Sequence, residues 1–317
     1  MTKRNLIYPI FLPMQGCPHR CIYCDQEKIS ASGTLDINSE IANAARFVNN
    51  HPHETKEIAF YGGSFTALTS AYRTNLMNRF QQIIDDTTSF RISTHPLYIN
   101  EAILAECAEQ GITCIELGIQ DFCSDVLQKS QRGYSGEQAL QAAKLVQQHG
   151  FKLGVQLLPG LPGSSTSSIA ENINRLSELK PDYLRIYPLI LIKGTALTTS
   201  YNRGEYLPLS LDEAVQICAD YAETADREGI TVIKLGLPST LALHDVVAGP
   251  YHPAFGEFVL AERLIRKIIC AVKNGEQINL DKKQRTLILA HKGRFKLILQ
   301  KRLENCSVKE QSLAPLL

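Results

Sequence analysis

Three cysteines near the start of the chain have the residue type and spacing of metal ligands. Cys17, Cys21 and Cys24 follow a C-x3-C-x2-C pattern, and no fourth cysteine lies close to them in the sequence. An iron–sulfur cubane contains four irons, and each iron needs a ligand. Three thiolates leave one iron open to another molecule. The pattern therefore indicates a cluster that takes part in chemistry and does not only store an electron.

Two other interpretations of these cysteines stay open at this stage. Structural zinc is normally held by four ligands, often as two C-x2-C pairs, and the loop contains only one such pair. His19 would complete a Cys3His set, but it lies inside the cysteine loop, where reaching the same ion as its neighbours is strained. The third interpretation is three reduced thiols without a metal.

The composition is that of a soluble globular protein of one large or two ordinary domains, with 317 residues, 44% hydrophobic and 21% charged. A net charge of +1 shows that the whole chain is not built to bind polyanions. We read no signal peptide and no apolar run near the roughly 20 residues that span a bilayer, so we expect no membrane partner. The other six cysteines are scattered, which is typical of a reducing cytoplasm, and we expect a cytoplasmic protein.

Short β-branched runs alternate with longer amphipathic runs from residue 6 to residue 235. The strand candidates are Leu6–Leu12, Glu57–Tyr61, Phe90–Ser93, Thr113–Ile119, Phe151–Leu157 and Asp182–Tyr187, with Ile230–Leu235 as a seventh. The helix candidates are Ser39–Asn50, Ser70–Asp85, Asn100–Gln110, Gly136–His149, Ser167–Leu179 and Leu211–Glu228. This alternation predicts an α/β fold with a parallel sheet and outer helices, wound into a partial (β/α)6 TIM-like barrel.

Motif-like loops follow the predicted strands and should meet on one rim. In a parallel α/β barrel, the loops at the carboxyl ends of the strands carry the site. The cysteine loop follows the first strand, and the motif Tyr61-Gly62-Gly63-Ser64-Phe65 follows the second. Two glycines at a strand end let the backbone approach a ligand closely, although the same motif by itself could be a simple turn.

The sequence changes character after about residue 240. We expect residues 1–240 to form the barrel, and residues 241–317 to form a small α+β extension that covers the site or binds a substrate. The extension should hold a helix over Phe255–Val272 and two strand-like runs, Arg285–Ala290 and Arg294–Leu299. Residues 263–302 contain twelve Lys or Arg and only two acids. Such a segment could follow a phosphate backbone, or it could be a solvated face balanced by acids elsewhere.

Three further features are candidates for substrate contact. We expect the segment from Tyr251 to Glu257, with His252, to fold over the mouth of the site; the alternative is a linker turn. Lys234 and His244 are weaker candidates.

Together the motifs resemble the radical S-adenosylmethionine (SAM) superfamily, over roughly Leu6 to Leu235. The stretches that also resemble the radical domain of the Elongator catalytic subunit and its bacterial YhcC-type relatives are Met14–Pro18, Tyr61–Phe65, Glu116–Gln120, Gln131–Tyr134 and Leu158–Gly163.

The resemblance implies a set of cofactor contacts. Cys17, Cys21 and Cys24 would bind three irons of a [4Fe–4S] cluster, and SAM would chelate the fourth. The backbone and hydroxyl groups of Gly62, Gly63 and Ser64 would receive the amino group of SAM, and Tyr23 would lie by the adenine or shield the cluster. The remaining candidates, each with a structural role as its alternative, are Glu116, Gln120, Arg132, Gln156 and Arg185.

The resemblance also implies an activity. Such an enzyme takes an electron from a reductant such as flavodoxin or ferredoxin, cleaves SAM to a 5′-deoxyadenosyl radical, and abstracts hydrogen from a substrate. The Elongator subunit has an acetyltransferase domain for which no Gly-rich acetyl-CoA loop is visible after residue 240, so we expect no acetyl transfer. RNA is one substrate hypothesis, through the basic C-terminal segment. The alternatives are a small-molecule oxidation of the tetrapyrrole type and a non-catalytic iron–sulfur or zinc protein.

Overall fold

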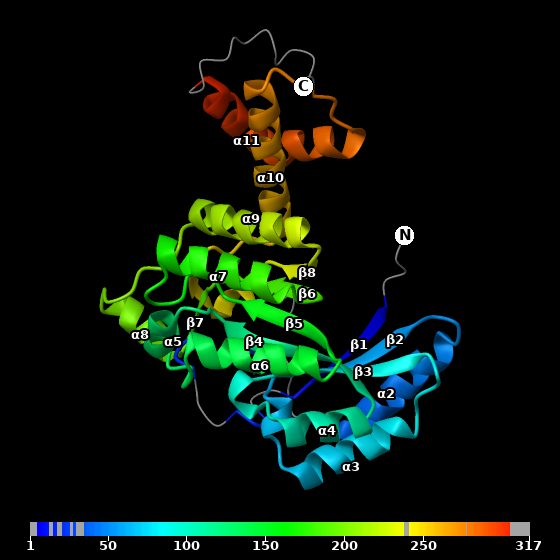
Figure 1. Cartoon of the computed structure of the whole chain (residues 1–317). Helices are drawn as coiled ribbons and strands as arrows, with labels where there is room; N and C mark the ends of the chain where they lie inside the picture. Colours follow the sequence, from blue (N-terminus) through cyan, green and yellow to red (C-terminus); the bar gives the residue numbers. More distant parts are fainter. Residues whose placement is uncertain are drawn as a thin grey trace.

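A curved sheet of seven parallel strands forms the centre of the protein (Figure 1). The computed structural model describes residues 5–12, 15–17, 21–25, 28–29, 35–237, 241–276 and 278–304. The strands lie in the order β1-β2-β3-β4-β5-β6-β8. Their bounds are β1 Leu6–Phe11, β2 Lys56–Tyr61, β3 Thr88–Thr94, β4 Ile112–Gln120, β5 Lys152–Leu157, β6 Tyr183–Ile186 and β8 Thr231–Leu235. This order confirms the predicted partial barrel, with the seventh strand β8 at one edge and β1 at the other.

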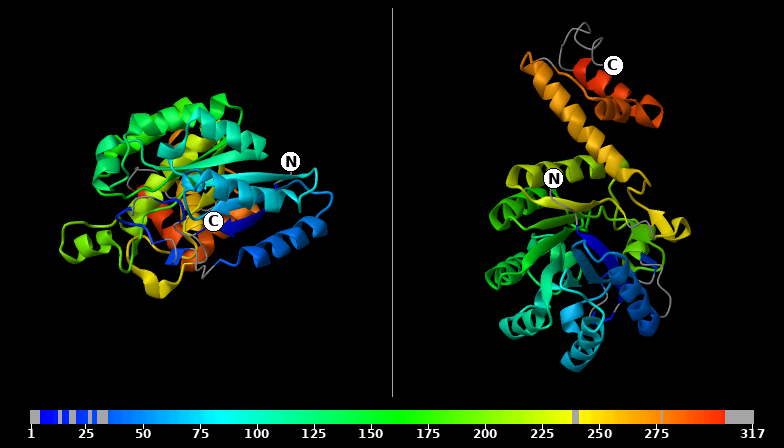
Figure 2. Two further views of the ribbon diagram at one scale, coloured as in Figure 1. Left: turned by 90° about the horizontal axis from the view of Figure 1, so that it is seen from below. Right: turned by 90° about the vertical axis from the view of Figure 1, so that its right-hand side faces the viewer.

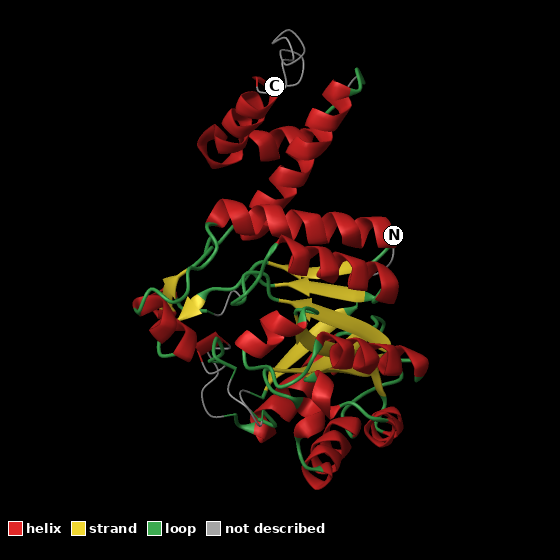
Figure 3. Ribbon diagram, turned by 60° about the vertical axis from the view of Figure 1, so that its left-hand side comes forward, coloured by secondary structure: helices red, strands yellow, loops and turns green. Residues whose placement is uncertain are grey.

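Helices cover the outer face of the sheet, as the colouring by secondary structure shows (Figure 3). The helices of the barrel are α2 Ile37–Asn50, α3 Ser70–Gln81, α4 Glu101–Glu109, α5 Ser124–Lys129, α6 Gly136–Gln148, α7 Thr166–Leu179, α8 Ala196–Asn202 and α9 Leu211–Glu228. The six predicted helices are confirmed, and the short α5 and α8 are additions. Each of these additions lies in the segment after a strand, where insertions shape the rim.

Sequence signals explain where several helices start and stop. Ser135 caps α6 with a complete capping box, as its place before the helix predicts. Gly111 and Gly150 have φ values of 75° and 79° just after α4 and α6. This left-handed conformation ends helices at little cost for glycine.

The core lies between the sheet and these helices. Central strands bury both faces, and β4 carries Ile115, Leu117 and Ile119 with no exposed surface. Cys107 and Cys114 are buried in this core and pack there as small hydrophobic side chains. No helix in the described ranges has the length and apolar character needed to cross a membrane.

The C-terminal extension is mainly helical, and the two predicted strands at Arg285–Ala290 and Arg294–Leu299 are wrong. Both runs lie in α11 (Lys282–Glu304), whose helical backbone is interrupted at a kink over residues 290–293. The buried residues of α11 recur at helical spacing: Ile288, Phe295, Leu299 and Leu303. Short apolar runs do not distinguish a strand from a buried helix by pattern alone, which explains the error.

The extension is attached through α10 (Phe255–Lys273), which packs on α9 and then projects away from the barrel with α11 (Figures 1 and 2). A short strand β9 (Val246–Ala248) pairs antiparallel with β7 (Leu191–Ile192), a loop strand beside the rim. The domain boundary at residue 240 stays a prediction.

Candidate cofactor site

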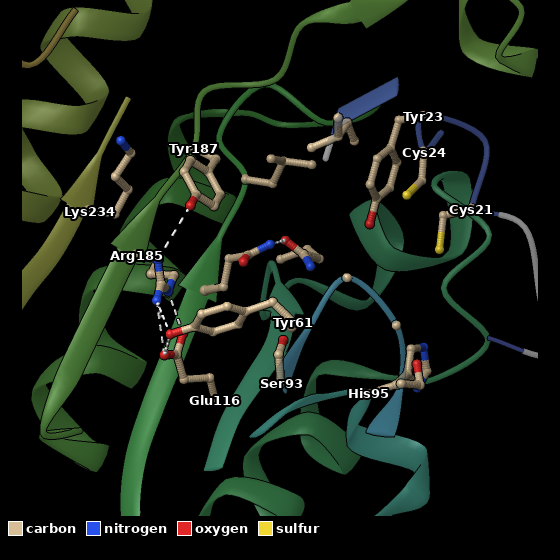
Figure 4. A pocket seen from close by; sticks show the side chains of 18 of the residues that line it. Cys21, Tyr23, Cys24, Tyr61, Ser93, His95, Glu116, Arg185, Tyr187 and Lys234 are labelled. Carbon is tan, nitrogen blue, oxygen red and sulfur yellow. Dashed lines mark hydrogen bonds and ion pairs between the residues drawn. The ribbon is translucent and has the colours of Figure 1, made fainter. Parts of the chain in front are cut away.

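A cavity of about 560 Å³ lies at the carboxyl ends of the strands (Figure 4). Its wall includes all twelve residues that the resemblance implies as cofactor contacts: Cys17, Cys21, Tyr23, Cys24, Gly62, Gly63, Ser64, Glu116, Gln120, Arg132, Gln156 and Arg185. They follow or end five different strands and are spread along the sequence from residue 17 to residue 185. The fold therefore brings the candidates together; their roles as cofactor ligands stay predictions.

The cysteine loop and the Gly-Gly loop interlock through their backbones. Ser64 N donates a hydrogen bond of 3.0 Å to Gln15 O. A Cβ atom at Gly63 would collide with Gln15 O and lie 2.7 Å from Leu12 O, and a Cβ atom at Gly16 would collide with Ser64 O. Only glycine permits such an approach, so the two loops form one surface facing the cavity.

Polar groups surround the three thiols in a way that suits an iron–sulfur cluster. Arg132 Nη1 donates a hydrogen bond of 3.0 Å to Cys21 Sγ, and Ser64 Oγ lies 3.4 Å from Cys17 Sγ. Burial, with Cys21 and Cys17 close by, raises the pKa of Cys24 to about 12. The pocket alone therefore does not stabilise the Cys24 thiolate, and a cationic group that binds this sulfur atom would hold it deprotonated.

The side chains do not converge as they would on a single metal ion. In the part of the chain that the structure describes, no group of three or more His, Cys, Asp or Glu could hold one ion. Each cubane iron takes its own thiolate, so cluster ligands need not meet at one point. His19, the candidate fourth zinc ligand, lies outside the described residues.

The buried hydroxyl group of Tyr23 fits a bound ligand in this cavity. Its side chain is buried, and its hydroxyl group has no hydrogen-bond partner within the described structure. Figure 4 shows this hydroxyl group directed into the cavity beside Cys21 and Cys24. A buried hydroxyl without a partner is costly, so a ligand that accepts or donates a hydrogen bond there would relieve the cost.

A buried charge network supports the opposite wall. Arg91 Nε donates to Glu57 Oε2 at 2.6 Å, and Arg91 Nη1 donates to Glu116 Oε1 at 2.8 Å. Glu116 also accepts from Arg185 through both of its oxygens. Burial would raise the pKa of Glu116, but Arg185 and Arg91 outweigh it and hold the pKa below its usual value. Glu116 is therefore a carboxylate in this network.

Tyr61 completes the network at the cavity surface. Arg185 Nη2 donates to Tyr61 OH at 2.7 Å, and Tyr61 OH lies 3.1 Å from Glu116 Oε1. The guanidinium of Arg185 also lies over the Tyr61 ring, at 4.9 Å from the ring centre. These contacts fix Arg185 in one orientation at the edge of the cavity (Figure 4).

Gly154 makes room for the ion pair between Glu116 and Arg185. Glu116 is on β4 and Arg185 is on β6, with β5 between them. Gly154 is the β5 residue that pairs in register with Glu116, and a Cβ atom there would lie 2.6 Å from Cγ of Glu116. A glycine at this position lets the carboxylate reach across a whole strand.

Gln120 is held in a strained conformation where β4 ends. Its φ of 71° lies in the left-handed region that non-glycine residues avoid. Behind it, Asp121 Oδ1 accepts from Cys123 N at 2.7 Å, and Asn172 donates to Asp121 and accepts from Phe122 N. These bonds fix the turn, and the amide oxygen of Gln120 accepts from Gln156 in the cavity wall.

Several residues of the cavity wall and of the charge network behind it were missed or undervalued at the sequence level. Tyr61 appears only as part of the Gly-Gly motif, Tyr187 only as a strand end, and Arg91 not at all. The missing signal is strand order and register. Without them the sequence does not reveal that Tyr61, Glu116 and Arg185 face one another. Lys234, a weak candidate, also lines the cavity.

The histidines expected at the mouth lie elsewhere. The ring of His252 packs 4.3 Å from that of Phe258 and 5.6 Å from that of His291, between α10 and α11. His244 has a largely exposed side chain beside Asp245. Neither is part of the cavity wall. His252 therefore does not contact the cavity, whereas Tyr251 of the same segment packs on the cluster of Ile190 and Leu241, which line it. That the segment covers the mouth of the site stays a prediction.

Comparison with protein families matches residues 11–176 to the radical SAM superfamily and residues 181–266 to the radical SAM C-terminal domain. A tRNA uridine(34) acetyltransferase of Methanocaldococcus jannaschii is 29% identical over 291 residues, covering 77% of this chain and 53% of that protein. Elongator complex protein 3 of Homo sapiens is 25% identical over 191 residues, and the match covers 53% of this chain and 35% of that protein.

Among solved structures, Elp3 of the archaeon Methanocaldococcus infernus, lacking its N-terminus, superposes with a TM-score of 0.63 at 20% identity. The match covers 85% of this chain and 63% of that one, and it shows a shared fold. The chain spans about half the length of the acetyltransferases that it matches.

Proposed function

Since the chain belongs to the radical SAM superfamily, we propose that its cavity holds a [4Fe–4S] cluster on Cys17, Cys21 and Cys24 with SAM beside it. The observation that carries this proposal is the meeting of all twelve candidate residues in one wall. When bound, the cluster would supply an electron for the reductive cleavage of SAM. SAM would in turn supply a radical able to take hydrogen from a substrate.

The residues of the chain position and shield these groups. Arg132 places a positive charge and a hydrogen bond at Cys21, next to the anionic sulfur atoms. The interlocked loops bring the backbone of Gly62 and Gly63 and the hydroxyl of Ser64 to the cavity wall, where their oxygen atoms could accept hydrogen bonds from the amino group of SAM. Buried apolar side chains, including Leu158, Leu189 and Ile190, form much of the remaining wall and exclude water from a reactive radical.

RNA is the substrate class that we propose, because relatives of this chain are named as tRNA-modifying enzymes. The basic segment supports this proposal only in part. Arg266 and Arg294 are paired with Asp220 and Asp212 of α9, at 2.6 Å and 2.7 Å. The exposed lysines of the extension have no ion pair among the described residues: Lys267, Lys273, Lys282, Lys283, Lys292 and Lys301. These six define the lysine surface that could follow a phosphate backbone.

We propose a flavodoxin or ferredoxin as the electron donor and the cytoplasm as the location. The eight cysteines in the described residues are all free thiols, which suits a reducing compartment.

The cofactor proposal is tested by anaerobic reconstitution. We expect about four irons and four sulfides per chain, and formation of 5′-deoxyadenosine when dithionite and SAM are added. Replacing Cys21 by serine should abolish both, whereas Cys270→Ser, at an exposed cysteine on α10, should change neither. Absence of 5′-deoxyadenosine from fully loaded protein, with and without total tRNA, would refute the proposal.

The RNA proposal is tested through the salt dependence of binding. We expect Lys267, Lys273 and Lys283, all replaced by glutamine, to weaken tRNA binding and to lower the slope of log K against log salt by about one unit per lost contact. The matched control replaces Lys144, Lys152 and Lys180, three exposed lysines on the barrel. Equal loss in both triple variants, or no binding by the unmodified protein, would count against RNA.

A further inference from the structure

Among the residues that the structure describes, one cation in the cavity wall lacks a counter-charge. Within this part of the chain, and leaving thiols aside, the charged side chains that line the cavity are Glu116, Arg132, Arg185 and Lys234. Glu116 is shared by Arg185 and Arg91, and Arg91 is also paired with Glu57. This four-residue network is therefore neutral. Arg132 lies at the cysteines, where its charge opposes that of thiolate ligands.

Lys234 is the cation that remains. No hydrogen bond or ion pair to its ammonium group occurs within the described ranges. It pairs in register with Arg185 on the neighbouring strand, so two cations lie side by side at this edge of the wall. Arg185 is engaged by Glu116 and Tyr61. An incoming anion at this edge therefore meets the free ammonium of Lys234.

Lys234 is also well separated from the proposed cofactor position. Figure 4 shows it on the side of the cavity opposite Cys21 and Cys24, with Tyr187 and Arg185 between. This placement argues for contact with a substrate and not with the iron-bound end of SAM.

Apolar residues from both edge strands line the same cavity. Ile7 and Pro9 of β1 face the cavity and are exposed, although Ile10 of the same strand is buried in the core. Ile233 on β8 and Leu237 just after it also line the wall. A cavity with apolar lining residues and a free ammonium suits a ligand that has an apolar part and a negative charge.

A lysine on an edge strand can also serve only to prevent pairing with another sheet. Such a lysine extends into solvent. Lys234 is instead half-buried and forms part of the cavity wall, which that role does not require.

We propose that Lys234 binds an oxyanion of the substrate, a carboxylate or a phosphate, while an apolar part of the substrate lies against the apolar residues that line the same cavity. This inference rests on the proposed function, because it assumes that the cavity holds the substrate of a radical SAM reaction. Anion binding at Lys234 is tested separately from that reaction.

The test is equilibrium dialysis of the reconstituted holoenzyme with SAM present. The probes are hexanoate for a carboxylate source, dibutyl phosphate for an RNA-like phosphodiester, and hexan-1-ol as the neutral analogue. We expect one of the two anions to bind more tightly than the alcohol, and Lys234→Met to weaken its binding by about ten- to hundredfold. Lys234→Arg should retain most of the affinity. The matched control Lys152→Met, at an exposed lysine at the start of β5 outside the cavity wall, should bind as the unmodified protein does.

Three results would overturn the inference: no preference for either anion over the alcohol, equal anion affinity in Lys234→Met, or a loss of SAM affinity in Lys234→Met as large as its loss of anion affinity. Failure of the proposed function has a different signature, because it appears in the unmodified protein as a loaded cluster that yields no 5′-deoxyadenosine.

Discussion

Replacing Gly154 by alanine should disturb the buried charge network without changing a charged residue. The new Cβ atom would lie 2.6 Å from Cγ and 3.2 Å from Cβ of Glu116. Carbon atoms pack favourably at about 3.5–4.0 Å. Either Glu116 moves by about 1 Å, which is enough to spoil its bonds to Arg185, or β4 and β5 separate. The backbone at Gly154 is outside the left-handed region, so alanine adds no dihedral strain.

The expected loss in the free energy of unfolding depends on whether Glu116 moves or the two strands separate. Overpacking a core by one methyl group costs about 1–3 kcal/mol. Loss of a buried ion pair that leaves Arg185 without a partner costs about 3–5 kcal/mol. We therefore expect Gly154→Ala to lower the free energy of unfolding by at least about 1 kcal/mol, and by up to about 5 kcal/mol if the carboxylate leaves Arg185.

A double-mutant cycle in urea, followed by circular dichroism of the metal-free protein, measures this effect. In a Glu116→Ala background the Cγ atom is absent, so Gly154→Ala should cost at least about 1 kcal/mol less than it does alone. The control is Gly256→Ala in α10, where a Cβ atom would make an ordinary contact of 3.5 Å with Leu235 O. Additive costs in the cycle, or a cost no larger than that of Gly256→Ala, would refute the steric reasoning.

Two further predictions concern the cofactor wall and the turn behind it. Arg132→Gln removes a positive charge and the hydrogen bond to Cys21 Sγ, so the cluster potential should fall, because charge and hydrogen bonds at the sulfur atoms set it. Redox titration followed by electron paramagnetic resonance checks this, and an unchanged or raised potential would contradict it. Burial raises the pKa of Asp121 to about 6, so the stability that its protonated form contributes is present below about pH 4 and is lost as the pH rises through 6. Relative to Asp121→Asn, the unmodified protein should lose up to about 3 kcal/mol between pH 4 and pH 7 in urea titrations, and a constant difference would show that Asp121 does not titrate there.

The barrel and its rim could be predicted because their signals are local. Each strand–helix unit carries its own periodicity, and parallel strands place every motif after a strand on one edge. The cysteine loop and the Gly-Gly loop were therefore expected side by side, and the backbone bond from Ser64 to Gln15 joins them.

The errors arise where the deciding contact is distant in the sequence. The charge of the basic segment is partly balanced by acids on α9, such as Asp212 and Asp220, which a count over residues 263–302 does not include. The network of Glu57, Arg91 and Glu116 joins three strands, and only their register shows that these side chains meet. The two apolar runs of α11 have the composition of strands, and only the pattern of residues that become buried in the folded protein identifies them as helical.

The interlocked loops have a consequence for how the holoenzyme is assembled. Gln15 and Gly16, just before Cys17, are held by Gly63 and Ser64, which follow β2, and these contacts involve backbone atoms and no metal. If the three cysteines hold a cluster as proposed, we expect the metal-free sheet to fold by itself and to take up iron afterwards. Zinc fingers differ, because their chain folds only around the metal.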